Sequence, residues 1–155
     1  MPLIPDTVAQ VMTKDVVTVT EDQDLRELDT AMRLLRFRHM PVVDGDKLVG
    51  IVSQRDVLRV TASSLMPNAH QQTQLLERRF HVRDLMTTRV RTVSPGSALV
   101  DVARIMQREK VGCLPVVDGR NVLVGIVTES DFVALAVQLL DRDAAFTKPP
   151  RSVGN

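Results

Sequence analysis

The sequence of this chain contains the same pattern twice within its 155 residues. Residues 11–45 align with residues 85–119 at a constant offset of 74, and 12 of the 35 positions are identical. After a one-residue insertion in the second copy, residues 48–58 align with residues 123–133, with 6 of 11 positions identical. Because a repeated sequence predicts a repeated structural unit, we expect two similar halves that pack with pseudo-two-fold symmetry.

Each copy predicts the same order of short elements, β-α-β-β-α, from its apolar spacing and its turn residues. The Asp-Gly turn after each Pro-Val-Val run predicts a hairpin. The first copy is expected to form strands over 16–20, 40–43 and 48–53. Its helices are expected from Asp22 or Asp24 to about Arg36, and from Ser53 or Asp56 onward. The second copy is expected to form strands over 90–94, 114–117 and 123–128, with helices over 98–109 and 131–140. The predicted fold class is α/β, and more narrowly α+β.

The two copies also set the predicted domain boundaries. The first domain is expected over residues 8–62 and the second over residues 81–141. Residues 63–80 are predicted to form a helical linker, with a helical stretch over 71–79. Residues 142–155 are polar and rich in proline, so they predict a disordered tail.

The composition excludes several classes of function. The net charge of +1 gives no excess of cations for phosphate neutralisation, and the absence of Trp and Tyr removes the usual base-stacking platform. Nucleic acid is therefore not an expected partner. No apolar run reaches the roughly 20 residues that span a bilayer, and the N-terminus lacks the pattern of a signal peptide, so we expect a cytoplasmic protein. The single cysteine, Cys113, excludes a disulfide framework and a multi-cysteine metal cluster.

The h-P-V-V-D-G turn and the G-h-V-(S/T)-x-x-D ending of each copy resemble the CBS domain family, named after cystathionine β-synthase. Two such domains in tandem form a Bateman module, and the resemblance covers about residues 8–140. It implies that the two halves pack through their strands and leave two clefts. It further implies that AMP, ADP, ATP, S-adenosylmethionine or a dinucleotide such as NAD can bind there, and that such pairs form homodimers.

The resemblance implies a main nucleotide cleft beside the ending of the second copy. Asp131 would hold the ribose hydroxyls, and Thr128 would contact ribose or phosphate next to a helix N-terminus. Arg38 and His39 of the first copy are the phosphate candidates, because nucleotide-binding relatives carry basic residues at this place. A purely structural reading stays open, in which Thr128 and Asp131 cap the helix and Arg38 lies on a solvated helix end.

A second, weaker cleft is expected at the equivalent turn of the first copy, where Ser53 and Asp56 take the ribose positions. The positions that match the two basic residues are Gly112 and Cys113, so a phosphate there would lose its main partner unless Arg55 or Lys110 substitutes. The expected apolar walls, which could equally be ordinary core, are Val90, Val111 and Pro115 in the main cleft and Val16 and Pro41 in the second.

These residues predict a regulatory adenosine-nucleotide sensor that acts on a separate partner protein and has no catalytic residues. The alternative is a ligand-free dimerisation or interaction module. A further possibility follows from the equivalence of His39 and Cys113 in the two copies, because symmetry could place a thiol beside an imidazole or form half of a metal site. The simpler reading is a buried thiol and an unrelated histidine, so neither catalysis nor a metal site is expected.

Overall fold

The structure, a computed structural model, describes residues 4–61 and 79–146 and contains two antiparallel two-stranded sheets. The first sheet pairs β1 (His39–Asp44) with β2 (Lys47–Ser53), and the second pairs β3 (Cys113–Val117) with β4 (Leu123–Thr128). The helices are η1 (Val8–Gln10), α1 (Leu25–Leu35), α2 (Gln54–Thr61), α4 (Val82–Leu85), α5 (Leu99–Glu109) and α6 (Glu129–Phe146). The predicted α+β class is confirmed, and the stretch 71–79 lies almost wholly outside the described residues.

The bounds of α1 follow from local sequence signals. The side chain of Asp24 accepts a hydrogen bond from the backbone N–H of Glu27 at 2.8 Å, which caps the helix N-terminus. The helix ends at Leu35, and the residue after it, Arg36, has a left-handed φ of 56°. The equivalent helix α5 ends in the same way, because the residue after it, Lys110, has a φ of 57°. The repeated sequence therefore stops both helices with the same backbone conformation.

The expected first strand of each copy is wrong in extent, because only one residue of each segment pairs with a neighbouring strand. Val19 receives a hydrogen bond from Val43 and donates one to the carbonyl of Pro41. The next bond of this parallel ladder would come from the N–H of Pro41, which proline lacks. Pro115 interrupts the equivalent pairing of Val93 for the same reason.

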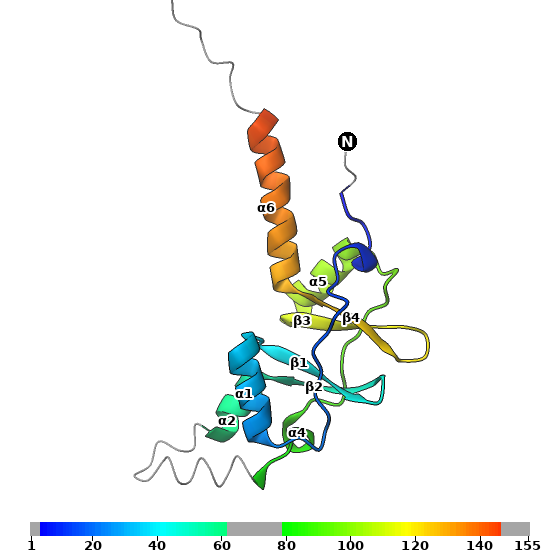
Figure 1. Ribbon diagram of the computed structural model, residues 1–155. Helices are drawn as coiled ribbons and strands as arrows, with labels where there is room; N and C mark the ends of the chain where they lie inside the picture. Colours follow the sequence, from blue (N-terminus) through cyan, green and yellow to red (C-terminus); the bar gives the residue numbers. More distant parts are fainter. Residues whose placement is uncertain (1–3, 62–78, 147–155) are drawn as a thin grey trace, which may run out of the picture.

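The last helix is longer than the sequence predicts. Helix α6 begins at Glu129 and continues to Phe146, whereas the expected helix covered 131–140. Residues 142–146, predicted as part of a disordered tail, are therefore helical. In Figure 1 this helix extends away from the rest of the fold.

The two halves exchange the segments that precede them. Val8 is fully buried in the second core with Leu114 and Val116, although it begins the predicted first domain. Val82 is fully buried in the first core with Leu25 and Leu28. In Figure 1 the blue N-terminal segment accordingly lies beside α5 and β4 before it descends to α1.

Backbone contacts confirm the predicted pseudo-two-fold relation between the halves. Thr13 pairs with Ile126, and the equivalent Thr87 pairs with Ile51. Lys47 and Val122 are equivalent to each other and pair directly, so this contact lies on the axis. Two backbone hydrogen bonds of 2.9 and 3.1 Å flank it and join the two hairpin turns. The two hairpins are therefore linked directly by their backbones.

Candidate functional site

Each G-h-V-(S/T)-x-x-D ending forms a turn in which the carboxylate binds its own backbone. In the second half, Oδ2 of Asp131 accepts from the N–H of Thr128 at 2.7 Å and from its hydroxyl at 3.1 Å. In the first half, Oδ2 of Asp56 accepts from the N–H of Ser53 at 2.8 Å and from its hydroxyl at 2.6 Å. Both turns open a helix, and in each turn the carboxylate caps the N–H of the residue that precedes the helix. Capping uses only one oxygen of each carboxylate.

The second carboxylate oxygen differs between the two turns. Oδ1 of Asp56 lies 3.8 Å from the guanidinium of Arg59, which is 79% exposed and therefore a weak partner. The position equivalent to Arg59 is Ala134, and Oδ1 of Asp131 has no ion pair within the described part of the chain. Oδ1 of Asp56 and Oδ1 of Asp131 thus remain able to accept a hydrogen bond from a ligand hydroxyl.

His39 lies where the two halves meet. It is the first residue of β1 and stands opposite Ser53 in the sheet. A Cβ built on Gly112 would lie 3.4 Å from Cε1 of His39 and 3.7 Å from Oε2 of Glu129. The imidazole of the first half therefore reaches the turn of the second half, and the absence of a side chain at Gly112 leaves room for it.

Charged groups from both halves act on this imidazole. Burial lowers the pKa of His39 below its ordinary value of 6.5, Asp56 and Glu129 oppose this, and Arg55 and Arg38 add to it. Glu129 was missed by the sequence prediction, although it follows Thr128 directly in the turn. Arg38 itself is exposed, and its carbonyl accepts the N–H of Gln54 at 2.8 Å, at the start of α2.

The pH dependence of folding should report on His39. Because its pKa is lowered in the folded state, the unfolded chain binds more protons near pH 6.5, and stability is lost as the pH falls through this value. We expect the free energy of unfolding, measured in urea, to fall less between about pH 7.5 and about pH 5 in His39→Gln than in the wild type. His81→Gln controls for loss of an imidazole elsewhere. Equal pH dependence in wild type and His39→Gln would contradict the described environment.

The proposed adenine walls differ in accessibility. Val16, Val90 and Val111 are partly exposed, so a ligand can contact them. Pro41 and Pro115 are buried within their strands and offer little surface. Only part of each expected wall is therefore available to a ligand.

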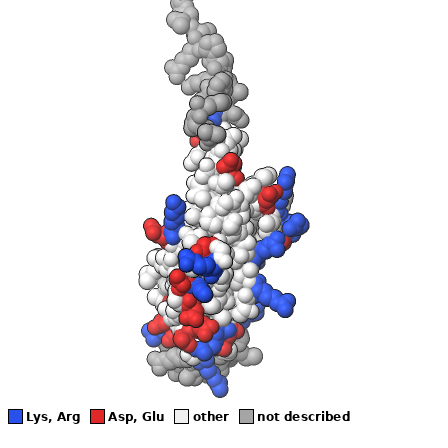
Figure 2. All heavy atoms as spheres, turned by 90° about the vertical axis from the view of Figure 1, so that its right-hand side faces the viewer, with Lys and Arg blue, Asp and Glu red and all other residues white. Residues whose placement is uncertain are grey.

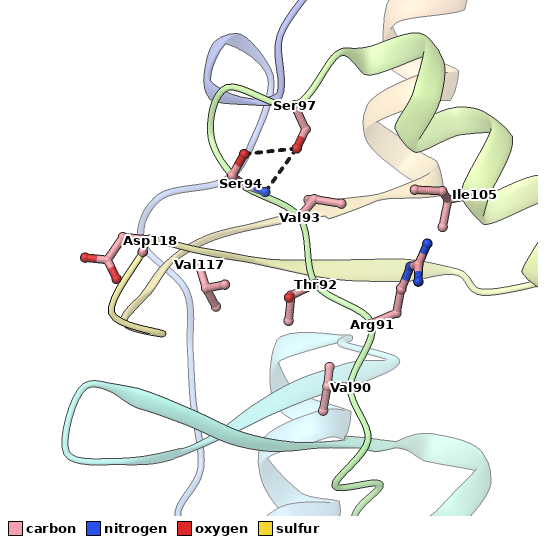
Figure 3. Close-up of a pocket in the computed structure, with 10 residues that line it drawn as sticks. Val90, Arg91, Thr92, Val93, Ser94, Ser97, Ile105, Val117 and Asp118 are labelled. Carbon is pink, nitrogen blue, oxygen red and sulfur yellow. Dashed lines mark hydrogen bonds between the residues drawn. The ribbon is translucent and has the colours of Figure 1, made fainter.

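A pocket of about 580 Å³ lies beside residues 90–94 and includes Val90 (Figure 3). The other residues that line it come from the segment 91–97, from α5, from the end of β3 and from the turn that follows β3, and none is a ribose or phosphate candidate. A second pocket of about 550 Å³ lies between the hairpin turns and is lined by Asp46, Lys47, Arg120 and Val122. Both pockets are thus distinct from the Thr128 and Ser53 turns.

The thiol of Cys113 is buried in β3. Burial, with a smaller contribution from Glu129, raises the pKa of Cys113 to about 12. The thiol is therefore protonated at neutral pH, which does not suit a nucleophile. Its environment supports the reading of a buried structural cysteine.

The surface charges are mixed in sign. Figure 2 shows Lys and Arg side chains interspersed with Asp and Glu over the face that carries the hairpin turns. Such a face lacks the single-sign field that a nucleic-acid backbone requires. Among the helices of the described residues, none has the length and apolar character needed to span a bilayer.

Two related α+β halves, each with a capped turn at the start of its last helix, define a tandem-repeat module. The family model of the CBS domain matches residues 8–63 and 82–137, and the chain belongs to this family. The chain spans 93% of one curated relative, which is 34% identical over 139 residues, but less than half of several others. The resemblance inferred from the repeated motifs is confirmed.

Solved structures show the same pair of domains. The AcuB protein of Vibrio cholerae is 38% identical with a TM-score of 0.75, over 95% of this chain and 100% of that one. CBSX2 from Arabidopsis thaliana, solved in complex with AMP, is 29% identical with a TM-score of 0.74, over 88% and 99%. The CBS domain pair of protein MJ0100, solved with 5′-methylthioadenosine and S-adenosyl-L-methionine, is 25% identical with a TM-score of 0.71, over 87% and 99%.

Proposed function

We propose that this chain is a regulatory module that binds an adenosine-type ligand between its halves and transmits the binding to a separate partner protein. The observation that carries the proposal is the junction at His39. There an imidazole of the first half adjoins Gly112 and Glu129 of the second half, and both ribose-type turns end nearby at Thr128 and Ser53. The adenosine ligands of two solved relatives support the same class of ligand.

The chemistry of the turns suits a ribose. A carboxylate held by its own backbone is preorganised, so it accepts ligand hydroxyl groups without losing side-chain freedom on binding. Two carboxylates are available, and the ligand could be AMP, ADP, ATP, S-adenosylmethionine or NAD. Protein contacts from both halves would favour one relative orientation of the halves, which is how the ligand would shift the population read by a partner.

The environment of His39 bears on which cleft binds phosphate. The resemblance to the family assigns Arg38 and His39 to the Asp131 cleft and makes that cleft the tighter one, and this assignment stays a prediction. His39 stands opposite Ser53 in the sheet, and the carbonyl of Arg38 accepts the N–H of Gln54 at 2.8 Å, so both basic residues adjoin the turn that leads to Asp56. This geometry favours the Asp56 cleft for the phosphorylated ligand. We therefore propose the Asp56 cleft as the tighter site for a nucleotide.

Two matched variants distinguish the clefts. We expect Asp56→Asn to weaken AMP binding in calorimetry by about 10-fold or more, because a charged hydrogen-bond acceptor for ribose becomes neutral. Asp131→Asn should change it less. Both variants keep an oxygen that can cap the turn, and unfolding without ligand checks that the fold is retained. The reverse order of effects would restore the assignment made from the sequence.

A thermal-shift series tests the proposal as a whole. AMP, ADP, ATP, S-adenosylmethionine or NAD at 100 times its dissociation constant should stabilise the wild type by about 2.7 kcal/mol. If none of them does, the module is a ligand-free interaction subunit. Exposed apolar side chains along α6 favour that alternative, or a homodimer of ligand-binding pairs, because they offer a surface for association; they are Val133, Val137 and Leu140.

A further inference from the structure

The segment 90–94 forms an open edge of the second sheet. Val93 makes both of its backbone hydrogen bonds with β3: its N–H donates to the carbonyl of Pro115, and its carbonyl accepts the N–H of Val117. Successive residues of an extended segment direct these groups to opposite sides, so those of Thr92 face away from β3. Within the described residues, the backbone of Thr92 makes no hydrogen bond. One donor and one acceptor are thus available to an added strand.

The pocket of about 580 Å³ lies along this edge. Figure 3 shows Val90 and Val93 on the segment and Ile105 on the neighbouring helix α5 around the pocket. Ile105 and Val90 are partly exposed, which gives the pocket an apolar side. At the far end, Ser94 donates its N–H to the Ser97 hydroxyl at 3.1 Å, and its carbonyl accepts the N–H of Ser97. That turn ends the edge, so an added strand must cover Thr92 and extend toward Val90.

Opposite charges mark two sides of this pocket. The side chain of Arg91 is 53% exposed, and within the described part of the chain its guanidinium makes one ion pair, a long contact of 3.5 Å to Glu109. Asp118 lies on the other side of the pocket, where Oδ1 accepts the N–H groups of Arg120 and Val122 at 2.8 and 2.9 Å. Its Oδ2 lies 3.8 Å from the guanidinium of Arg120, whose side chain is 86% exposed and therefore a weak partner. The two backbone hydrogen bonds hold the pKa of Asp118 below its ordinary value, so its carboxylate stays charged. An occupant with a basic residue at one end and an acidic residue at the other complements both.

We propose that the edge at Thr92 binds an extended peptide segment of a partner protein, which adds as a short strand with an acidic side chain at Arg91 and a basic one at Asp118. Main-chain hydrogen bonds to Thr92 supply the affinity, and the two charges fix the direction of the peptide. The first half lacks this arrangement, because Val17 occupies the position equivalent to Arg91 and Ala31 the position equivalent to Ile105. The site is distinct from both ribose turns and does not depend on a bound nucleotide.

The test uses the full chain and the capped peptide Lys-Val-Thr-Val-Glu in an NMR titration. The backbone amide of Thr92 should shift on addition of peptide up to about 1 mM and exchange more slowly with solvent. The amide of Thr18, its equivalent in the first half, is the internal control and should stay unchanged. A peptide methylated on the amide nitrogen of its central Thr should bind about 5-fold or more weakly, since it loses a backbone hydrogen bond.

Charge reversal gives a second, independent readout that needs no change in the backbone. Arg91→Glu should prefer the peptide Lys-Val-Thr-Val-Lys over Lys-Val-Thr-Val-Glu, whereas the wild type prefers the reverse, and added salt should reduce both preferences. An unshifted Thr92 amide, or equal binding of the methylated peptide, would overturn the proposal. The proposal would also be overturned if, without peptide, the Thr92 amide exchanged more slowly as the protein concentration was raised, because a second copy of the chain would then cover the edge.

Discussion

Gly125→Ala is expected to lower the free energy of unfolding by about 1–3 kcal/mol, the usual cost of overfilling a packed core. A Cβ at this position would lie 2.6 Å from Sδ of Met12 and 3.0 Å from the carbonyl oxygen of Thr13. Both atoms belong to the N-terminal segment that packs on the second half. The loss would be measured by urea unfolding at pH 7.5, followed by circular dichroism.

Two further variants connect this loss to the exchanged segment. Gly96→Ala is the matched control, because a Cβ there would meet nothing within 4 Å, and it should be neutral or slightly stabilising. Combining Gly125→Ala with Met12→Ala should cost less than the sum of the two single changes, since the closest atom is removed. A fully additive pair, or a Gly125→Ala protein as stable as the control, would contradict the contact of Met12 with β4.

Leu28→Ala should destabilise the protein by about 2–5 kcal/mol, because it removes a fully buried side chain from the first core and leaves a cavity. Since Val8 and Val82 each belong to the core of the opposite half, we expect this change in one half to loosen the other. Hydrogen exchange of the Val116 amide in β3 should therefore accelerate along with that of Val42 in β1. Leu34→Ala on the same helix is the control, because Leu34 is 78% exposed.

The unfolding transition of Leu28→Ala separates two descriptions of the module. A single transition with an unchanged denaturant slope means that both halves unfold as one unit. Two transitions, with the exchange of the Val116 amide unaffected, would mean that each half is stable without the other. The exchanged segments and the paired hairpin turns lead us to expect the single transition.

Much of the site could be predicted from the sequence because its interactions are local. Thr128 and Asp131 are three residues apart, and so are Ser53 and Asp56, so each turn forms its hydrogen bonds within one short segment. The place of His39 relative to Gly112 and Glu129 could not be predicted in this way, since it depends on how two distant segments pack. The expected first strands were wrong in extent because the ladder ends at a proline of a different strand.

The sequence by itself determined the repeat, the order of its elements, the hairpins and the capped turns, because apolar spacing and turn residues act over a few positions along the chain. Only the tertiary structure decided that Val8 and Val82 are buried in the opposite halves, and that Thr92 is left at an open edge. Two similar halves offer each preceding segment two nearly equivalent grooves. The choice between them rests on long-range packing, such as that of Met12 on Gly125 and of Met86 on Gly50, which no local pattern contains.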